Sequence, residues 1–280
     1  MVTTGKWETN ERIVGCWDFE QLDTRLGSLF IFIHELNCAE KSAGTIHFLN
    51  VLPQHQGLID VCQRFSKHRI VVNDFSTLEI PSLIHDQLDP STTSRTGSMQ
   101  WIGRLYAQSN RVQPCANTSD CLSKNNDKTV VAVHLKNNPN DIQSNADHDA
   151  WLSAFVMLSK QYGSVKFVIV GDDDIPTAIA SLDCVEKYQG SIGDYFSVVC
   201  EADAFIGMSS AFCAAAILGA KPYRVWKHIG HHTDIMAREL NQNNQFPFAI
   251  EGQKMCIAHD TVDNIVTETS NMLQAMKDKG

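Results

Sequence analysis

Apolar and amphipathic segments alternate over the first seventy residues of the chain. Three short apolar runs, 12–20, 45–51 and 69–73, are rich in β-branched and aromatic side chains and predict strands. Between them, 26–41 and 57–66 carry apolar residues at spacings of three and four, which predicts two helices. This order of strands and helices is typical of a parallel sheet with helices on its faces.

A second alternating series begins near residue 130. Its apolar runs predict strands at 130–135, 165–170, 204–208 and near Trp226. The predicted helices are 147–162, a short one opened by Pro176, 192–202, a small-residue helix after Met208, one near 234–240 and an amphipathic one at 261–277. The chain is therefore expected to be an α/β protein with two Rossmann-like domains and a cleft between them.

A polar stretch separates the two series. From about 107 to 128 the chain reads AQSNRVQPCANTSDCLSKNNDK, which has no apolar periodicity and predicts a linker. The expected organisation is a domain at 1–110, a linker at 111–128, a second domain at 129–260 and a final helix at 261–280 that packs back across the domains.

Composition and charge narrow the class of protein. With 280 residues, 43% hydrophobic and 20% charged, the chain has ample material for folded cores. The net charge of -9 and the absence of a basic stripe argue against a nucleic-acid surface, so an anionic ligand must be held locally. Neither a transmembrane helix nor a signal peptide is expected, and the cytoplasm is the expected compartment.

The nine cysteines are odd in number and mostly lie in apolar runs, which predicts reduced core residues. Cys115 and Cys121 alone have the spacing of a local bridge or a metal clip. No second Cys or His pair follows at the spacing of a zinc site, so free thiols are expected at both positions.

Two serines stand where a predicted strand becomes a helix, in ADAFIGMSSAFCAAAILGAKPYRVW. Ligands of parallel sheets bind outside the carboxyl ends of the strands, where the next helix offers unpaired N–H groups. Gly207 and the alanines after Ser210 let a ligand approach closely. Ser209 and Ser210 therefore either cap the helix or form part of a phosphate-binding site.

The surrounding segment, YQGSIGDYFSVVCEADAFIGMSSAFCAAAILGAKPYRVWK, resembles the nucleotide-binding half of GT-B glycosyltransferases, especially the lipopolysaccharide heptosyltransferase type. In that family, a segment of the form A-D-x-x-I-G-x-D-S-G, followed by a small-residue helix, holds the diphosphate of the sugar nucleotide. Ser210 matches the motif serine, whereas Ser209 and Ala211 stand where the motif has Asp and Gly.

Two further segments resemble GT-B enzymes. RLGSLFIFIHEL is similar to the heptosyltransferase motif x-L-G-D-x-L-x-x-x-P-x-L, with Ser28 in the place of the motif Asp. VAVHLKNNPND is similar to the H-x-R-x-x-D segment of fucosyltransferase-type enzymes, which implies phosphate contacts for His134 and Lys136. Lys136 replaces the arginine and offers a point charge without the bidentate fork.

An inverting sugar transfer needs a base that removes the proton of the acceptor hydroxyl. Because a serine cannot act as a base unaided, Asp23 and Asp18 are the candidates to replace the motif Asp at Ser28. For Asp23 the alternative role is a helix cap. His34 lies on the predicted helix and is less well placed to reach a cleft.

Two more polar clusters have alternative interpretations. Asp172, Asp173 and Asp174 follow Gly171 and form either a metal-binding D-x-D motif or a turn that caps the helix near Pro176. His228, His231 and His232 form either a metal site or a polar loop. The resemblance to GT-B enzymes, which generally need no metal, favours the turn for the aspartates. For the histidines the loop is favoured, with one imidazole as a candidate phosphate contact. Gly171, Asp172 and His228 remain candidate nucleotide contacts.

The resemblance implies a metal-independent glycosyltransferase of polysaccharide biosynthesis. It would take a nucleotide-sugar donor in the second domain and pass the sugar to a glycan or lipid-linked acceptor of the lipopolysaccharide or capsule type, at the inner face of a membrane. No separate cofactor is expected, because the nucleotide sugar is the substrate. The alternatives are a GT-B hydrolase or epimerase and a non-catalytic nucleotide-sugar-binding protein.

Overall fold

A computed structural model describes residues 12–20, 25–40, 42–72, 121–122, 128–219, 221–231 and 233–278. The chain divides into two compact units, Met1–Thr118 and Ser119–Gly280. The point of division falls inside the range expected for the linker. Within the described ranges, no helix has the length and apolar character needed to cross a membrane.

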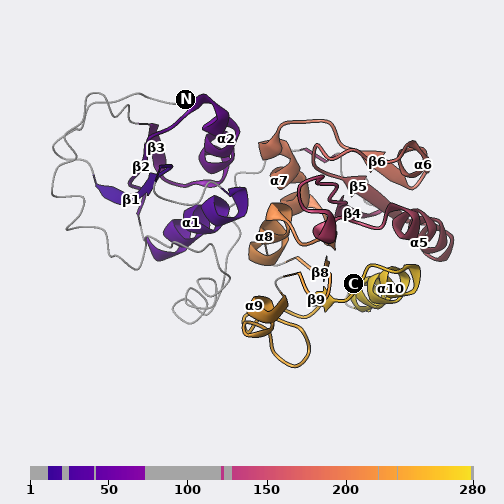
Figure 1. Cartoon of the computed structure of the whole chain (residues 1–280). Coiled ribbons are helices and arrows are strands. Elements are labelled where there is room, and N and C mark those ends of the chain that lie inside the picture. Colours follow the sequence, from indigo (N-terminus) through magenta and orange to yellow (C-terminus); the bar gives the residue numbers. More distant parts are fainter. Residues whose placement is uncertain are drawn as a thin grey trace. The chain divides into compact units, whose positions relative to one another are not determined.

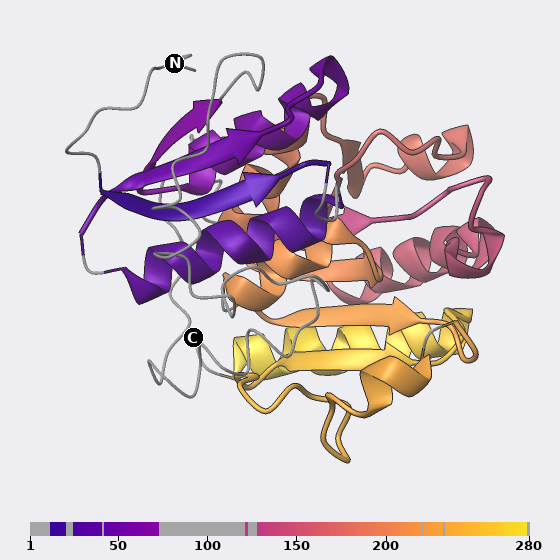
Figure 2. The same cartoon turned by 60° about the vertical axis from the view of Figure 1, so that its left-hand side comes forward.

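The amino-terminal unit contains a parallel sheet with the strand order β1-β2-β3 (Figures 1 and 2). Its elements confirm the predicted alternation; they are β1 (Ile13–Asp18), α1 (Leu26–Ala39), β2 (Thr45–Leu49), the 3-10 turn η1 (Pro53–His55), α2 (Gln56–Phe65) and β3 (Arg69–Val72). Helix α1 packs closely on β1, because a Cβ atom at Gly15 would lie 2.5 Å from Leu36 Cδ1. The core of this unit joins the sheet to both helices around Trp17, Phe32 and Phe48.

The carboxyl-terminal unit is built on six parallel strands in the order β6-β5-β4-β7-β8-β9. They are β4 (Thr129–His134), β5 (Val165–Ile169), β6 (Val185–Lys187), β7 (Ala204–Met208), β8 (Tyr223–Lys227) and β9 (Gln253–Ile257). This is the strand order of the doubly wound dinucleotide-binding fold, in which the direction of winding changes between the first and fourth strands. Here that switch point lies between β4 and β7.

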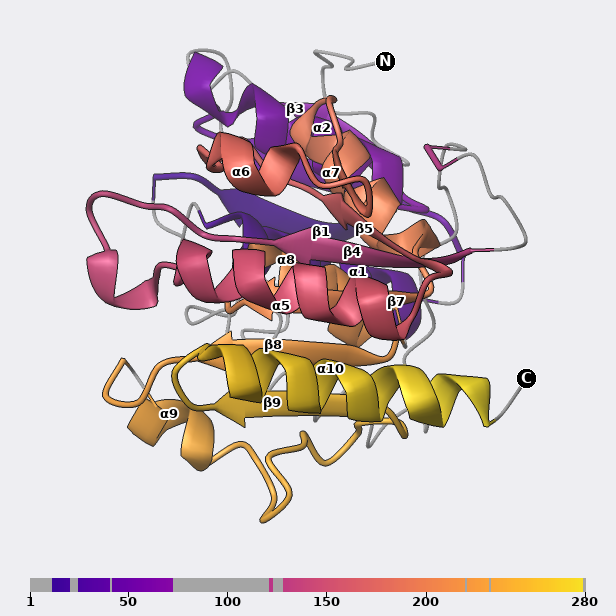
Figure 3. The same ribbon diagram turned by 90° about the vertical axis from the view of Figure 1, so that its right-hand side faces the viewer.

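Helices cover both faces of this sheet. They are α5 (His148–Gln161), α6 (Thr177–Ala180), α7 (Ile192–Glu201), α8 (Ala211–Leu218), α9 (Thr233–Ala237) and α10 (Val262–Lys277), with a 3-10 turn η3 at Ile142–Ser144. Helices α5 and α10 lie side by side on one face, and α7 and α8 pack together on the other (Figures 1 and 3). The prediction of two Rossmann-like α/β units with parallel sheets is confirmed.

Aromatic side chains fix the helices to this sheet. The Trp151 ring of α5 meets the Trp226 ring of β8 edge to face at 5.2 Å, and Phe155 lies 4.7 Å from Phe167 of β5. The final helix α10 packs against α5 and β8 of its own unit and buries Ile265. Its predicted contact with the other domain stays a prediction.

Candidate functional site

The carboxyl edge of the second sheet collects most of the predicted site residues. Strand β4 ends at His134, β7 at Met208 and β8 at Lys227. Each of the predicted donor or nucleotide contacts lies at or just beyond a strand end on this edge; they are His134, Lys136, Gly171, Asp172, Gly207, Ser209, Ser210 and His228. Parallel strands place all their carboxyl ends at one edge, so the topology brings these residues to the same side of the unit.

Gly207 brings β4 and β7 together at the switch point. It stands opposite His134 in the strand register and has a φ of 142°. A Cβ atom at this position would lie 2.3 Å from the carbonyl oxygen of His134 and 2.8 Å from its nitrogen. Both the backbone conformation and the space therefore require glycine. The result is a close approach of β7 to the His134 backbone of β4, one residue before β7 ends.

Ser210, and not Ser209, is the residue that precedes the first turn of α8. The N–H of Ser209 donates to the Trp226 carbonyl at 2.8 Å. The Ser210 side chain makes no capping bond, and its Oγ is buried without a partner among the described residues. By contrast, Ser191 caps α7 by accepting from the Asp194 N–H. The capping role considered for this serine pair is thus not performed by the Ser210 hydroxyl.

His134 presents a second buried polar atom without a partner at this edge. Its side chain is 5% exposed, and Nε2 lies 3.0 Å from Asp173 Oδ2. Because a carboxylate only accepts hydrogen bonds, Nε2 carries a proton and donates. Nδ1 is buried and has no partner within the described part of the chain. Gly171, with a φ of 104°, lies against the Cδ2–Nε2 edge of the ring, so Nδ1 is on the opposite side.

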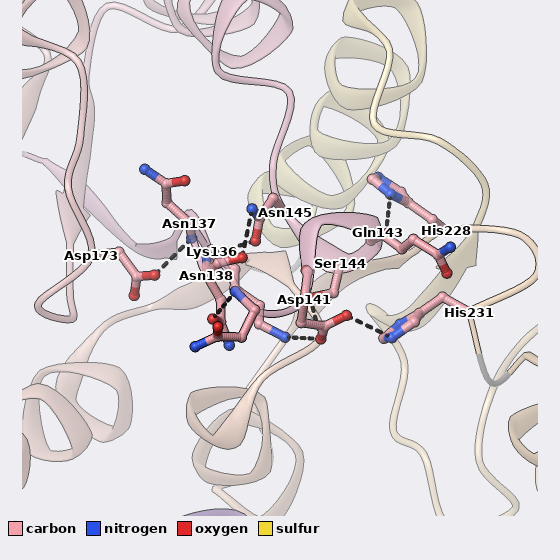
Figure 4. A network of polar contacts seen from close by, with 11 residues as sticks. Lys136, Asn137, Asn138, Asp141, Gln143, Ser144, Asn145, Asp173, His228 and His231 are labelled. Carbon is pink, nitrogen blue, oxygen red and sulfur yellow. Dashed lines mark hydrogen bonds and ion pairs between the residues drawn. The ribbon is translucent and has the colours of Figure 1, made fainter.

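Asp173 orients this imidazole. Its Oδ1 accepts from the backbone N–H of Asn137 at 2.7 Å, while Oδ2 faces His134 (Figure 4 shows the Asn137 bond). Burial acts to raise the pKa of Asp173, but the hydrogen bonds from His134 and Asn137 outweigh it and lower that pKa. The carboxylate is therefore ionised and holds the ring in place.

Lys136 is ion-paired inside the unit. Its Nζ lies 2.8 Å from Asp141 Oδ2, which also accepts from the Ser144 hydroxyl at 2.6 Å (Figure 4). His231 Nε2 lies 3.1 Å from the other oxygen of Asp141. The hydrogen bond from Lys136, and then that from Ser144, lower the pKa of Asp141 to about 2. Lys136, which the sequence analysis predicts to contact a phosphate, is thus already paired with Asp141.

Sequence reasoning missed Lys227, the last residue of β8. The half-buried ammonium group interacts electrostatically with Lys136, Cys213 and Asp141, which places it beside the start of α8. Burial lowers the pKa of Lys227, and the positive charge of Lys136 lowers it further. The only signal in the sequence is a lysine that ends an apolar strand of this edge.

His228 anchors a loop. Its Nδ1 donates to the Gln143 carbonyl at 2.8 Å, and its Nε2 lies 2.6 Å from Asp260 Oδ1 (Figure 4 shows the Gln143 bond). Asp260 is buried and also accepts from Trp151 Nε1 at 2.7 Å. Both ring nitrogens of His228 are therefore engaged within the protein. This arrangement favours the loop interpretation of the histidine cluster; His232 lies outside the described residues.

The three consecutive aspartates after β5, Asp172 to Asp174, form hydrogen bonds with different neighbours. Asp172 Oδ1 accepts from the Tyr195 hydroxyl at 2.6 Å, and burial together with this carboxylate raises the pKa of Tyr195 to about 12. Asp173 turns to His134, and the backbone oxygen of Asp174 accepts from Asn137 at 3.1 Å. Over the described ranges, no three His, Cys, Asp or Glu side chains converge as a metal site requires.

In the amino-terminal unit, Asp18 ends β1 at the carboxyl edge of its sheet. Its Oδ1 accepts from Asn50 Nδ2 at 2.8 Å and from the Glu20 N–H at 2.9 Å. Asp23, the other candidate base, lies outside the described residues. Ser28 is buried in the first turn of α1. His34 is buried further along α1, and burial lowers its pKa to about 4.

The two cysteines with a local spacing are only partly described. Cys121 forms no disulfide within the described residues, and its backbone N–H donates to the carboxylate of Glu201 at 3.0 Å. Cys115 lies outside the described residues, so the expectation of a free thiol there stays a prediction.

No protein-family model matches the sequence, and no curated protein does. Solved structures do match. A glycosyl transferase family 9 protein from Veillonella parvula DSM 2008 aligns with 94% of this chain and 89% of its own, at 12% identity and a TM-score of 0.55. The chain has a GT-B-type fold.

Two E. coli structures share this GT-B fold. ADP-heptose lipopolysaccharide heptosyltransferase II matches at 10% identity and a TM-score of 0.53, over 95% of this chain and 99% of its own. Heptosyltransferase WaaC with ADP matches at 9% identity and a TM-score of 0.51, over 95% and 98%. At such identities the similarity concerns the GT-B fold.

Proposed function

We propose that the chain is a glycosyltransferase that moves a sugar from a nucleotide-sugar donor to a glycan or lipid-linked acceptor. The observation that carries the proposal is the pair of buried polar atoms without partners at the switch point, Ser210 Oγ and His134 Nδ1. Buried polar groups are normally hydrogen-bonded, and exceptions need an explanation such as a ligand. The GT-B-type fold supports the proposal.

The geometry of this edge suits a diphosphate. The first N–H groups of a helix have no partner within it, and the helix dipole favours an anion there. Gly207 lets β7 approach the His134 backbone of β4 closely, which places the end of β7 and the start of α8 beside His134. Ser210 can donate its hydroxyl to a phosphate oxygen, and Ser209 and Lys136 are proposed to add contacts. Gly171, Asp172 and the His228 loop would border the nucleoside.

Asp18 is the proposed base. In an inverting transfer, a carboxylate takes the proton of the acceptor hydroxyl, whose oxygen attacks the anomeric carbon as the bond to the diphosphate breaks. The hydrogen bond from Asn50 to Oδ1 fixes the Asp18 carboxylate. We propose that no metal or cofactor takes part. Asp23 remains the second candidate for the base.

The biological setting is proposed from the fold and from the motifs described above. Two of the similar structures are heptosyltransferases, one with lipopolysaccharide in its name. A role in lipopolysaccharide- or capsule-type polysaccharide synthesis, at the cytoplasmic face of the inner membrane, fits this likeness. The nucleotide base, the sugar and the acceptor are not assigned.

The test is product analysis with isotopically labelled UDP-, GDP-, ADP- and CMP-sugars, in the presence of candidate acceptor glycans. Label on the acceptor supports the proposal, whereas free sugar or an epimerised donor would replace it by the hydrolase or epimerase alternative. Donor binding without turnover would favour the non-catalytic alternative.

The base is tested separately by Asp18→Asn. Turnover should fall about 100-fold or more while donor affinity stays unchanged, because the base acts on the acceptor. Glu20→Gln, an exposed neighbour that loses the same charge, is the control and should keep full activity. Full activity of Asp18→Asn would shift the assignment to Asp23.

A further inference from the structure

Lys227 lies beside the start of α8. The residue before it, Trp226, accepts a hydrogen bond from the N–H of Ser209, so the end of β8 lies next to the residues that precede α8. The Lys227 ammonium interacts electrostatically with Cys213 in the first turn of α8 and with Lys136 after β4. Two lysines from different strands therefore lie at the same end of α8.

Among the described residues, the charge of Lys227 has no partner. Over the described part of the chain, its Nζ makes no hydrogen bond and no ion pair, whereas Lys136 pairs with Asp141 and Lys254 with Glu268. Asp141 is the acidic group of the site that interacts with Lys227, and its oxygens already serve Lys136, Ser144 and His231. Cys213 offers no compensating charge, because burial raises the pKa of its thiol.

An arrangement of this kind is unfavourable in the empty protein. A half-buried ammonium without a partner, next to a second lysine, loses hydration and is repelled by its neighbour. The pKa of Lys227 is lowered by burial first and also by Lys136, although Cys213 and Asp141 act to raise it. Charged groups in such unfavourable surroundings are often found at functional sites, because a ligand of opposite charge offsets the lost hydration and the repulsion.

Two independent observations point to a ligand at this place. Ser210 Oγ at the start of α8 is buried without a partner among the described residues. His134, 5% exposed in its side chain, has a buried Nδ1 that is also without one, on the side of the ring away from Gly171. The Ser210 hydroxyl and the Lys227 ammonium are donors that phosphate oxygens would satisfy. His134 Nδ1, with the ring proton on Nε2, is an acceptor that a hydroxyl group of the same ligand would satisfy.

We infer that Lys227 is the principal cationic ligand of the donor diphosphate, while Lys136 keeps its bond to Asp141 and plays the smaller part. This inference rests on the proposed function and adds a residue to it. As the bond between the sugar and the diphosphate breaks, negative charge grows on the leaving phosphate oxygens. A lysine fixed beside them stabilises that charge.

The test compares three variants that each remove one positive charge: Lys227→Gln, Lys136→Gln and, as a control, Lys160→Gln. Lys160 is exposed in the last turn of α5, at the opposite edge of the sheet. Calorimetric titration with inorganic pyrophosphate and with UDP, GDP, ADP and CDP measures the affinity. We expect Lys227→Gln to weaken binding about tenfold or more, Lys136→Gln to weaken it less, and the control to leave it unchanged.

The melting temperature of the empty protein gives a second readout. Because Lys227 has no partner in the ranges that the structure describes, Lys227→Gln should match or exceed the wild type in stability, whereas a structural lysine would destabilise the protein on removal. The charge-preserving Lys227→Arg should retain binding. It should also remove the early loss of affinity at alkaline pH that the lowered pKa of Lys227 predicts for the wild type.

The outcomes separate this inference from the proposed function. Equal affinity of wild type and Lys227→Gln for a nucleoside diphosphate would overturn the role of Lys227 and leave the proposed function standing. Binding of pyrophosphate but of no nucleoside diphosphate, lost in Lys227→Gln, would support the anion site and argue against the nucleotide-sugar donor. Failure of the wild type to bind any of the probes would overturn both.

Discussion

At the scale of single residues, the close packing of β7 on β4 in the second sheet depends on Gly207. Its positive φ and the His134 backbone directly beneath it leave no room for a Cβ atom. The same contact sets the distance between β4 and β7, from which His134 and the start of α8 are positioned. A residue without a side chain is thus required for the packing of β7 on β4.

Gly207→Ala should lower the free energy of unfolding by about 3 kcal/mol, because it adds both backbone strain and a steric clash. Gly163→Ala is the matched control, since no atom lies within 4 Å of the added Cβ atom and its φ is outside the strained range. The control should change stability by less than about 1 kcal/mol. Urea denaturation measures both variants, and equal stability of the two would contradict the close approach of β4 and β7.

At the scale of elements, the starts of α7 and α8 differ although both follow a serine. Ser191 and Asp194 form a reciprocal capping box at α7. Ser210 precedes α8, and its hydroxyl has no partner within the described part of the chain. The serine at the first helix end is hydrogen-bonded within the protein, whereas Ser210 Oγ at the second has no partner among the described residues.

Alanine substitutions of Ser191 and Ser210 distinguish a serine that caps a helix from one that binds a ligand. Ser191→Ala should destabilise the protein by about 1 kcal/mol and leave nucleoside diphosphate binding intact. Ser210→Ala should stay within about 0.5 kcal/mol of wild-type stability, because no bond is lost, yet bind the diphosphate more weakly. Thermal denaturation with and without ligand measures both effects. Destabilisation by Ser210→Ala with unchanged binding would assign the residue to helix capping instead.

At the scale of the whole molecule, the sequence predicts the fold better than the site. Apolar periodicity identified the long strands and helices, because burial on one or both faces leaves a regular pattern. It missed β6, which has only three residues, VEK, and β9, whose QKMCI includes two polar residues. Short strands and strands with polar positions gain their structure from neighbours in the sheet and leave a weak local signal.

The sequence could predict that the site residues lie at the carboxyl edge of the sheet, but it could not predict which contacts each of them makes. Strand ends are visible in the sequence and pointed to Ser209 and Ser210, whereas His134 came from the resemblance of its segment to fucosyltransferase-type enzymes. Which lysine is free depends on tertiary neighbours: Asp141 compensates Lys136, while Lys227 is left without a partner in the described part of the chain. Charge pairing of this kind is set by packing and leaves no mark in local spacing.

The central claim is that the carboxyl edge at β4, β7 and α8 binds the diphosphate of a nucleotide. The most direct measurement is a two-dimensional amide NMR titration of the labelled protein with the nucleoside diphosphate that raises its melting temperature most. The account predicts that the amide signals of Ala211 and Phe212 move with the same apparent affinity as the thermal shift, while that of Gly163 at the opposite edge stays fixed. Unmoved signals at the start of α8, with changes confined to the opposite edge around Val130 and Lys166, would contradict it.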